Sequence, residues 1–503
     1  MTPEVRAPRR RDATWKLVVA FVTPLAVAVA AVVVISKTGD GSSAVPGSSP
    51  SNKPNVLVIM TDDQTLESMK VMANTNALLA AQGTTFSKFY VAFPNCCPSR
   101  ATFLTGQYPH NNGVTDNVAP EGGFSKLRGD ETLPVWLQRS GYYTASVGKY
   151  LNTWGQDGIR PPPGWSHWFG LIDPTTYHYY NYSVSNDGKR QDYGTAETDY
   201  QTDVLGAEVK RTITEAAASG RPWFVQWTPL TPHAQYSEHA STGDSQAMDE
   251  STIPVPPPRF RGRFANEPLP KPGSYNQSDM SGMPAFVASR APITGAEEPI
   301  LERLYRAELE ALLAVDEWVG TLVKALEDTS QMSNTVIIFT SDNGMFHGEH
   351  RLPYGKVFLF EPATHVPLIV RGGPFPKGVS IDSMAVNADL APTILGLAGA
   401  TAGITLDGRD LVPITLNPSA PGRSILLESW FNQGRGDRLH MYAVHDGEHV
   451  LMKDSSGYEA LFDLSSDPDQ MRNRVDDPAQ ADLKAKLDAK LESLAVCAGP
   501  ACG

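Results

Sequence analysis

Two short apolar runs, each followed at once by acidic residues, constrain the fold of this chain more than any other feature. Residues 55–60 read NVLVIM, and residues 335–340 read TVIIFT. Runs of this length without polar interruption are typical of strands that are buried on both faces of a parallel sheet. The sequence therefore predicts that both runs lie in the centre of such a sheet.

Further segments alternate between helical and strand-like patterns. Residues 132–139 and 301–328 have helical patterns, whereas residues 143–147 and 222–227 resemble strands. Within 301–328 the apolar side chains recur near one face, as in an amphipathic helix. Alternation of this kind indicates an α/β fold, in which helices cover both faces of a large, mostly parallel sheet.

Polar side chains follow both central runs. Asp62 and Asp63 come directly after the first, and Asp342 and Asn343 come directly after the second. Each pair alone is common in turns and helix caps. Ligands of open α/β sheets, however, bind beyond the carboxyl ends of the strands, where the fold can bring both pairs together. Oxygen ligands suit Ca²⁺ or Mg²⁺ rather than zinc.

The pattern of the chain changes near residue 418. Short antiparallel strands and a terminal helix are predicted at 423–428, 441–445, 449–453 and 479–494. We therefore expect a large domain over residues 54–417 and a smaller subdomain, an antiparallel sheet with a helix, over residues 418–503. Residues 237–298 are rich in Pro, Ser, Gly and charge, which predicts a long surface excursion.

The N-terminus has the pattern of an export signal. Basic side chains dominate residues 1–16, and residues 17–35 carry no charge. About 20 apolar residues span a bilayer, and basic residues ahead of them keep the N-terminus inside. We expect either a cleaved signal peptide or a retained membrane anchor. Residues 36–53 form a flexible linker on this interpretation, and the remaining chain lies outside the cell or on its surface.

The overall charge argues against nucleic acid as a partner. The chain has 42 Lys and Arg residues against 55 Asp and Glu residues, a formal net charge of -13. An acidic protein repels nucleic acid at long range. A locally basic pocket can still bind a small anionic substrate.

The four cysteines fall into two adjacent or nearly adjacent pairs. Cys497 and Cys502 are predicted to form a local disulfide, because the chain is expected to be exported. Cys96 and Cys97 are neighbours, and neighbouring cysteines rarely bridge each other. A helix predicted to begin near Ser99 would place Cys96 beside a helix N-terminus, which favours anions. Cys96 is therefore a candidate nucleophile, although a buried cysteine in a turn is the better explanation of a bare Cys-x-Pro.

A longer pattern around Cys96 carries a family resemblance. Residues 96–106 read CCPSRATFLTG and residues 108–111 read YPHN. Cys-x-Pro-Ser-Arg followed by Leu-Thr-Gly resembles the defining motif of the formylglycine-dependent sulfatases, which belong to the alkaline phosphatase-like superfamily. The form found here is most similar to the N-acetylglucosamine-6-sulfatase and heparan endosulfatase branch. The resemblance extends through ordered motifs from about residue 54 to residue 480.

The resemblance implies a modified nucleophile and a bound metal ion. Cys96 would be oxidised to formylglycine (3-oxoalanine) by a formylglycine-generating enzyme that reads Cys96, Pro98 and Arg100. One Ca²⁺ would be bound by the modified Cys96 and by the residues that follow the two central runs, namely Asp62, Asp63, Asp342 and Asn343.

Further catalytic residues are implied by the same resemblance. Lys149 matches a lysine that contacts the nucleophile and the sulfate, and Lys356 matches a second lysine that contacts the sulfate. His233 matches a histidine near the leaving-group oxygen. Many sulfatases carry another histidine two residues after the first lysine, where this chain has Leu151. This difference leaves the base that releases sulfate without a candidate.

The activity implied is hydrolysis of a sulfate monoester, for example of N-acetylglucosamine 6-sulfate in a sulfated carbohydrate. One hydroxyl of the formylglycine hydrate would attack sulfur, and the second would expel sulfate. Three alternatives stay open. The chain could be a phosphomonoester or phosphodiester hydrolase of the same superfamily, or a metal-stabilised surface protein without activity. Redox exchange between Cys96 and Cys97 is the third, although the Cys-x-x-Cys spacing is missing.

Overall fold

The structure is a computed structural model that describes residues 53–235, 253–416, 422–432 and 438–503. The predicted export segment at 1–16 and 17–35 and the linker up to residue 52 lie outside these residues. Among the residues that are described, no helix is long and apolar enough to cross a membrane.

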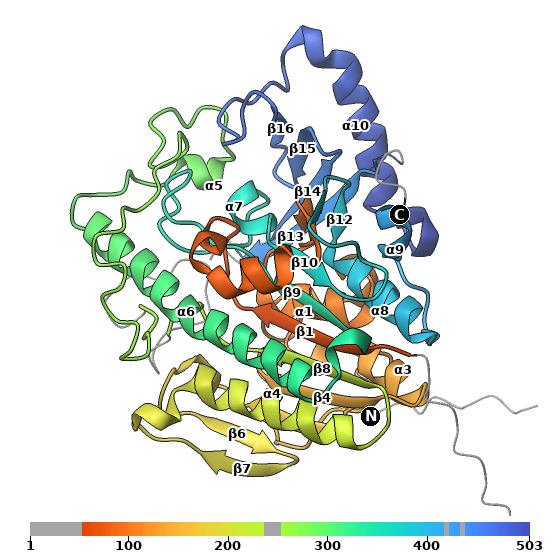
Figure 1. Cartoon of the computed structure of the whole chain (residues 1–503). Helices are drawn as coiled ribbons and strands as arrows, with labels where there is room; N and C mark the ends of the chain where they lie inside the picture. The colour runs from red at the N-terminus through yellow and green to blue at the C-terminus, as the bar shows by residue number, and fades with distance from the viewer. Residues whose placement is uncertain (1–52, 236–252, 417–421, 433–437) are drawn as a thin grey trace, which may run out of the picture. The chain divides into compact units, whose positions relative to one another are not determined.

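A ten-stranded mixed sheet forms the centre of the fold (Figure 1). Its order is β11-β2-β10-β9-β1-β8-β4-β5-β6-β7. The strands are β1 (Asn55–Thr61), β2 (Thr84–Phe86), β4 (Tyr143–Gly148), β5 (His167–Leu171), β6 (Ser183–Asn186), β7 (Lys189–Asp192), β8 (Trp223–Thr228), β9 (Thr335–Ser341), β10 (Leu368–Arg371) and β11 (Val379–Ile381). The five central strands from β9 to β5 are parallel, whereas β10, β6 and β7 pair antiparallel with their neighbours. The predicted α/β fold with a mostly parallel, mixed sheet is confirmed.

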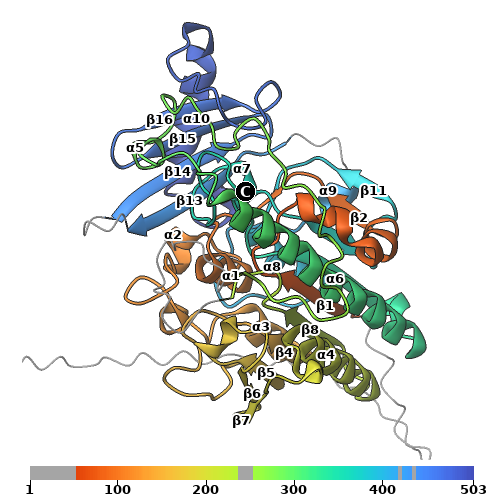
Figure 2. The same cartoon turned by 90° about the vertical axis from the view of Figure 1, so that its left-hand side faces the viewer.

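Both faces of this sheet are buried under helices. On β1, Val56 and Val58 pack into one apolar core and Leu57 and Ile59 pack into another. Successive side chains of a strand point to opposite faces, so an uninterrupted apolar run is required here. α4 (Gln201–Ala218) and α6 (Glu298–Asp328) lie side by side on one face (Figures 1 and 2). The other face carries α1 (Cys96–Thr105), α3 (Leu133–Arg139) and α8 (Leu390–Ala398).

The remaining elements are short. The helices are α2 (Pro109–Asn112), α5 (Ala285–Ala288), α7 (Glu361–Thr364) and α9 (Val412–Leu416). β3 (Phe89–Tyr90) and β12 (Ala385–Val386) form a separate parallel pair.

Helix α1 begins at Cys96, not near Ser99 as the sequence suggested. The side chain of Asn95 caps the helix by accepting a hydrogen bond from the Cys96 amide at 3.1 Å. Pro98 is compatible with this position because amides of the first helical turn have no partner within the helix. Cys96 therefore lies inside the first turn rather than ahead of it.

The predicted C-terminal antiparallel sheet with its helix is confirmed. Its strands are β13 (Ile425–Asn432), β14 (Arg438–His445), β15 (His449–Asp454) and β16 (Glu459–Asp463), and its helix is α10 (Ala481–Leu494). The strand β16 is an addition to the three strands that were expected. Cys497 and Cys502 form a disulfide just after α10, with their Cα atoms 5.2 Å apart.

Of the surface excursion expected at 237–298, the structure describes residues 253–298. Leu269, Met283 and Val287 are buried there. This part of the segment is therefore packed against the domain, because its apolar side chains find partners that a local pattern does not reveal.

Candidate active site

The site lies at the carboxyl ends of four neighbouring parallel strands, in the order β9-β1-β8-β4. Their last residues are paired in register, Ser341 with Thr61 and Thr228 with Gly148. The polar residues that follow each strand therefore emerge at one edge. Together with side chains from α1 and from the loop after β9, they form a cluster that includes the partly buried Lys356 and whose other members are all buried, namely Asp62, Asp63, Cys96, Arg100, Lys149, His233, Asp342 and Asn343. The structure thus brings together every catalytic and metal-binding residue that the sequence analysis named.

Cys96 lies at the centre of this cluster. Its Sγ is 3.0 Å from Lys356 Nζ, 3.4 Å from Lys149 Nζ and 3.6 Å from Asp62 Oδ1. Burial raises the pKa of the Cys96 thiol to about 12, although the two lysines act in the opposite direction. A thiol of this kind is protonated near neutral pH and is a weak nucleophile.

The amides at the start of α1 already have partners in the protein. Asn95 accepts from the Cys96 amide, and Asn117 Oδ1 accepts from the Cys97 amide at 2.9 Å. Asn117 in turn donates to Asn95 Oδ1 at 2.7 Å. The expected anion site at the helix N-terminus therefore does not use these amides, and cationic side chains supply the positive charge instead.

Arg100 connects the two acidic pairs. Its Nε donates to Asp342 Oδ2 at 2.8 Å, and its second terminal nitrogen is 3.4 Å from Asp62 Oδ2. The other terminal nitrogen donates to the carbonyl of Lys149 at 2.9 Å. Because the guanidinium is planar and buried, it holds these groups in one arrangement.

Asp63 is the most crowded carboxylate of the site. Its Oδ1 accepts from Asn343 Nδ2 at 2.6 Å and pairs with the Lys356 ammonium, and its Oδ2 lies 3.4 Å from His233 Nε2. The backbone of Asp63 has a positive φ of 67°, which is uncommon for a residue other than glycine. The local backbone is therefore bent to direct this side chain into the cluster.

The cluster has the composition of a metal-binding site. Asp62, Asp63, Cys96 and His233 each offer a ligand atom, and these atoms lie within 4.8 Å of one another. Asp63 Oδ2 and Asn343 Oδ1 are buried oxygens that accept no hydrogen bond from the described residues. Buried polar atoms normally have partners, so these oxygens fit a cation.

Both carboxylate oxygens of Asp342 accept hydrogen bonds. Besides its bond from Arg100, its Oδ1 accepts from the Asp63 amide at 3.2 Å. Its carbonyl accepts a hydrogen bond from the Ser99 hydroxyl. These contacts orient Asp342 toward the cluster while leaving each carboxylate oxygen a second lone pair for a ligand.

His233 is held in one orientation. Its Nδ1 donates to the Ala234 carbonyl at 2.6 Å, which leaves Nε2 facing Asp63. The Tyr179 hydroxyl donates to the His233 carbonyl at 2.8 Å. Burial lowers the pKa of His233, and the nearby carboxylates of Asp63 and Asp62 oppose this shift.

Leu151, which replaces a common family histidine, does not face the nucleophile. Its side chain is buried in the apolar core beside α1 and α3. Two other residues contact the same part of the site. The Lys149 ammonium lies over the Tyr177 ring at 4.8 Å from its centre, and Asn152 Nδ2 donates to the Tyr177 hydroxyl at 2.8 Å. Tyr177 was not among the predicted site residues, because its one sequence signal is the tyrosine-rich stretch at 177–182.

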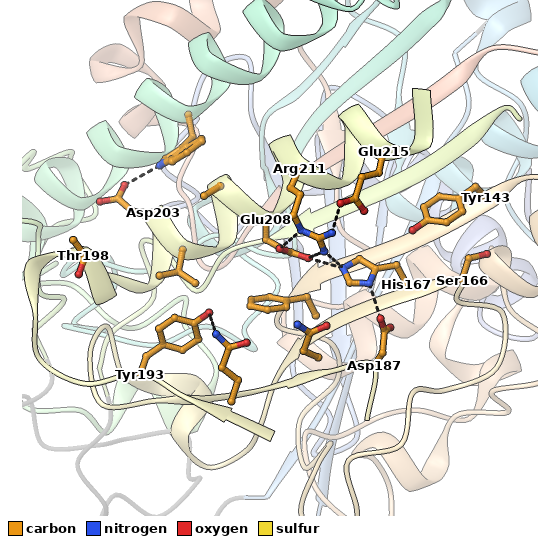
Figure 3. A pocket seen from close by; sticks show the side chains of 16 residues that line it. Tyr143, Ser166, His167, Asp187, Tyr193, Thr198, Asp203, Glu208, Arg211 and Glu215 are labelled. Atoms are coloured by element: carbon orange, nitrogen blue, oxygen red, sulfur yellow. Dashed lines mark hydrogen bonds and ion pairs between the residues drawn. The ribbon is translucent and has the colours of Figure 1, made fainter. Parts of the chain in front are cut away.

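A separate cavity of about 950 Å³ lies between the sheet edge and α4 (Figure 3). Its main polar group is His167, whose Nδ1 is 3.0 Å from Asp187 Oδ2 and whose Nε2 is 2.6 Å from Glu208 Oε1. None of the predicted site residues lines it. The cavity is therefore distinct from the cluster around Cys96.

Comparisons with known proteins agree with this geometry. The family model described as Sulfatase matches residues 54–400, and the model described as N-sulphoglucosamine sulphohydrolase, C-terminal, matches residues 348–496. The human N-acetylglucosamine-6-sulfatase is 31% identical over 498 residues, which cover 90% of this chain and 86% of the relative. The chain belongs to the sulfatase family. It is accordingly an enzyme, a sulfuric ester hydrolase.

Solved structures share the fold. One structure, in complex with its substrate D-glucosamine-2-N,6-O-disulfate, has a TM-score of 0.74 at 24% identity and covers 88% of this chain and 97% of its own. The phosphonate monoester hydrolase of Agrobacterium radiobacter has a TM-score of 0.62 at 22% identity and covers 88% of this chain and 95% of its own. The alkaline phosphatase-like fold is therefore found both in a protein with a sulfated sugar as its substrate and in a hydrolase of phosphonate monoesters.

Proposed function

We propose that this enzyme removes the 6-sulfate of N-acetylglucosamine or a closely similar amino sugar in a glycan, with Cys96 as formylglycine and with one Ca²⁺. The observation that carries the proposal is the position of Cys96, which lies between two lysine ammonium groups and a set of buried carboxylates. The sugar is supported by the names of the human relative and of the substrate in the similar solved structure.

The residues proposed to bind the metal ion are Asp62, Asp63, Asp342 and Asn343, together with the modified Cys96. Their donors would all be oxygens once Cys96 is oxidised, which favours Ca²⁺ over transition metals. Three carboxylates face three cationic side chains in this cluster. When bound, Ca²⁺ would polarise the sulfate and lower the pKa of the attacking hydroxyl.

The nucleophile requires oxidation of Cys96. The hydrate of formylglycine supplies two hydroxyls, so that one can attack sulfur and the other can release sulfate without attack by external water. In the structure Cys96 Sγ marks where these oxygens would lie, 3.0 Å from Lys356 and 3.4 Å from Lys149. Both ammonium groups can therefore donate hydrogen bonds to the nucleophile and to sulfate oxygens as charge develops.

The leaving sugar alcohol needs a proton when its bond to sulfur breaks. His233 and Lys356 are the candidates, because both contact Asp63 at the edge of the cluster. Because the Nδ1–H of His233 donates to the Ala234 carbonyl, its Nε2 can give a proton only when the ring is charged, whereas the Lys356 ammonium carries protons to give. Arg100 acts by holding Asp342 and the Lys149 carbonyl in place.

The proposed function also includes oxidation of Cys96 during maturation and export of the enzyme from the cell. Cys96, Pro98 and Arg100 present the pattern read by a formylglycine-generating enzyme, and the apolar segment at 17–35 engages the membrane during export. The mature enzyme then meets its sulfated carbohydrate outside the cell.

Mass spectrometry of the peptide that contains Cys96 tests the proposal directly. Protein co-expressed with a formylglycine-generating enzyme should lose about 18 Da at Cys96, as a thiol becomes an aldehyde. The modified protein should hydrolyse N-acetylglucosamine 6-sulfate and should prefer aryl sulfates to the matched aryl phosphates. Cys97→Ser is the matched control for Cys96→Ala, because Cys97 is also buried and free but packs into the apolar core.

Only Cys96→Ala should abolish turnover. An intact thiol at Cys96 in a protein that still cleaves esters would contradict the mechanism. A preference for the phosphate ester would favour the phosphoesterase alternative.

A further inference from the structure

Tyr177 lies against two of the proposed catalytic side chains. It ends the short 3-10 helix η4 (Thr175–Tyr177), and it is buried. Its ring centre is 4.8 Å from the Lys149 ammonium and 5.2 Å from the centre of the His233 ring. The tyrosine thus forms part of the wall of the site although no charged or metal-binding role falls to it.

The contact with Lys149 has a clear physical basis. An ammonium within about 6 Å of an aromatic ring centre is attracted to the ring face, and the attraction is larger when water is excluded. The same ammonium is 2.5 Å from Asp62 Oδ2 and 3.4 Å from Cys96 Sγ. A lysine side chain has four flexible carbons, so the ring restricts where this charge can lie.

The chain segment that carries Lys149 in turn holds Tyr177 in place. Asn152, three residues further along, donates to the Tyr177 hydroxyl at 2.8 Å and is also buried. The ring therefore contacts Lys149 and its hydroxyl contacts Asn152. Lys149 and Asn152 thus both contact Tyr177, whereas Leu151, which lies between them in the sequence, packs into the apolar core.

We infer that Tyr177 is a positioning residue for sulfate-ester hydrolysis, which holds the Lys149 ammonium against residue 96 and lies beside His233. This inference rests on the proposed function. Tyr177 acts through Lys149, because its ring offers an aromatic face to that ammonium at 4.8 Å. Displacement of a catalytic group by about 1 Å can lower a rate by about 100-fold, so removal of the ring should have a large effect.

Kinetics of two Tyr177 variants test the inference. Tyr177→Leu should lower kcat by about 100-fold with little change in KM, because the loss is confined to the transition state. Tyr177→Phe keeps the ring and should retain most of the rate. Tyr182→Leu is the matched control, because Tyr182 is a buried tyrosine of the same segment that stacks on Tyr193, away from the site.

A double-mutant cycle with Lys149→Ala separates positioning from general packing. In the Lys149→Ala background, Tyr177→Leu should cost less than about threefold, because the group on which it acts is gone. An equal loss in both backgrounds, or a loss no larger than that of Tyr182→Leu, would overturn the inference.

Crystal structures of the wild type and of Tyr177→Leu provide a readout that needs no turnover. The Lys149 ammonium should leave its position near Asp62 and residue 96 in the variant. An unmoved ammonium would overturn the inference. If the wild type with formylglycine hydrolyses no sulfate ester, the proposed function fails, and the two structures still decide the role of Tyr177.

Discussion

Lys149 Nζ and Asp62 Oδ2 lie 2.5 Å apart, although their strands β4 and β1 are separated in the sheet by β8. Both side chains are buried. The pair can form because three parallel strands end at the same level. It joins the proposed metal-binding carboxylates to the cations around Cys96, so its loss should affect both stability and activity.

Lys149→Met is predicted to destabilise the enzyme and to lower kcat by about 100- to 1,000-fold, the loss typical of removing one group that stabilises developing charge. Removal of one partner from a buried ion pair leaves an uncompensated charge, which costs about 3–5 kcal/mol. Urea unfolding measures this loss, and assays with an aryl sulfate measure the activity. Lys324→Met is the control, because the exposed pair of Lys324 with Asp328 should contribute little. A Lys149→Met variant as stable as Lys324→Met would show that Asp62 does not need this charge.

Calcium is predicted to stabilise the folded enzyme, and Asn343→Ala is predicted to weaken the effect. A ligand that binds only the folded state adds about 2.7 kcal/mol at 100 times its Kd. Thermal unfolding in EGTA and in excess Ca²⁺ measures the difference in Tm. Asn334→Ala, at an exposed asparagine before β9, should keep the full shift. Equal stabilisation by Mg²⁺ would contradict the assignment of the ion.

Asn95→Ala is predicted to lower both stability and kcat. Loss of a helix cap costs about 1 kcal/mol, and the Asn95 side chain also fixes the first turn, where Cys96 lies. Asp477→Ala is the matched control, because the Asp477 side chain caps the segment at Pro478–Gln480 by accepting from the Ala479 amide. Both variants should lose similar stability, but only Asn95→Ala should lose activity. Unchanged kcat in Asn95→Ala would show that the cap does not position the nucleophile.

Glu361 is predicted to make the enzyme sensitive to acid. Burial alone would raise the pKa of Glu361, but hydrogen bonds and charges from His365 and His445 outweigh burial and hold it well below its usual value. A glutamate with a lowered pKa contributes stability that is present above its unfolded pKa of about 4.3 and is lost as the pH falls below it.

The stability that His365 contributes depends on pH in the opposite direction. Burial lowers its pKa, but Glu361 outweighs this effect and raises it. The stability it contributes is complete below its unfolded pKa of about 6.5 and is lost as the pH rises through its folded pKa. Unfolding midpoints between about pH 3 and pH 9 should therefore show a maximum that Glu361→Gln flattens. Glu492→Gln, at an exposed glutamate of α10, should leave the profile unchanged.

The central sheet and the cluster at its edge were predictable from local pattern. The runs at 55–60 and 335–340 are nearly continuously apolar because β1 and β9 are buried on both faces. Parallel strands then direct Asp62 and Asp342 to one edge. Lys149, His233 and Lys356 carry no such local signal, and only their place in ordered motifs indicated them.

Other features depend on contacts that no local pattern encodes. The start of α1 was placed three residues late, because its cap is the side chain of Asn95, which is braced by Asn117. Val287 was expected on the surface because residues 237–298 are rich in Pro, Ser, Gly and charge, yet it packs into the core around the C-terminal sheet. Tyr177 carried no functional signal in the sequence. Its contact with Lys149 joins residues that are 28 positions apart, and no local pattern predicts such a contact.

The sequence by itself determined the fold class, the family and the identity of the chemical groups. Apolar runs that indicate strands buried on both faces, and the order of the motifs, are both visible in the amino-acid sequence. The tertiary structure alone decided how those groups meet. Strands β1 and β4 do not touch, yet Lys149 pairs with Asp62. A buried charge is costly unless an opposite charge pairs with it, because the protein interior has a low dielectric constant. In this cluster the paired charges come from segments that are distant in the sequence, so only the tertiary structure can bring them together.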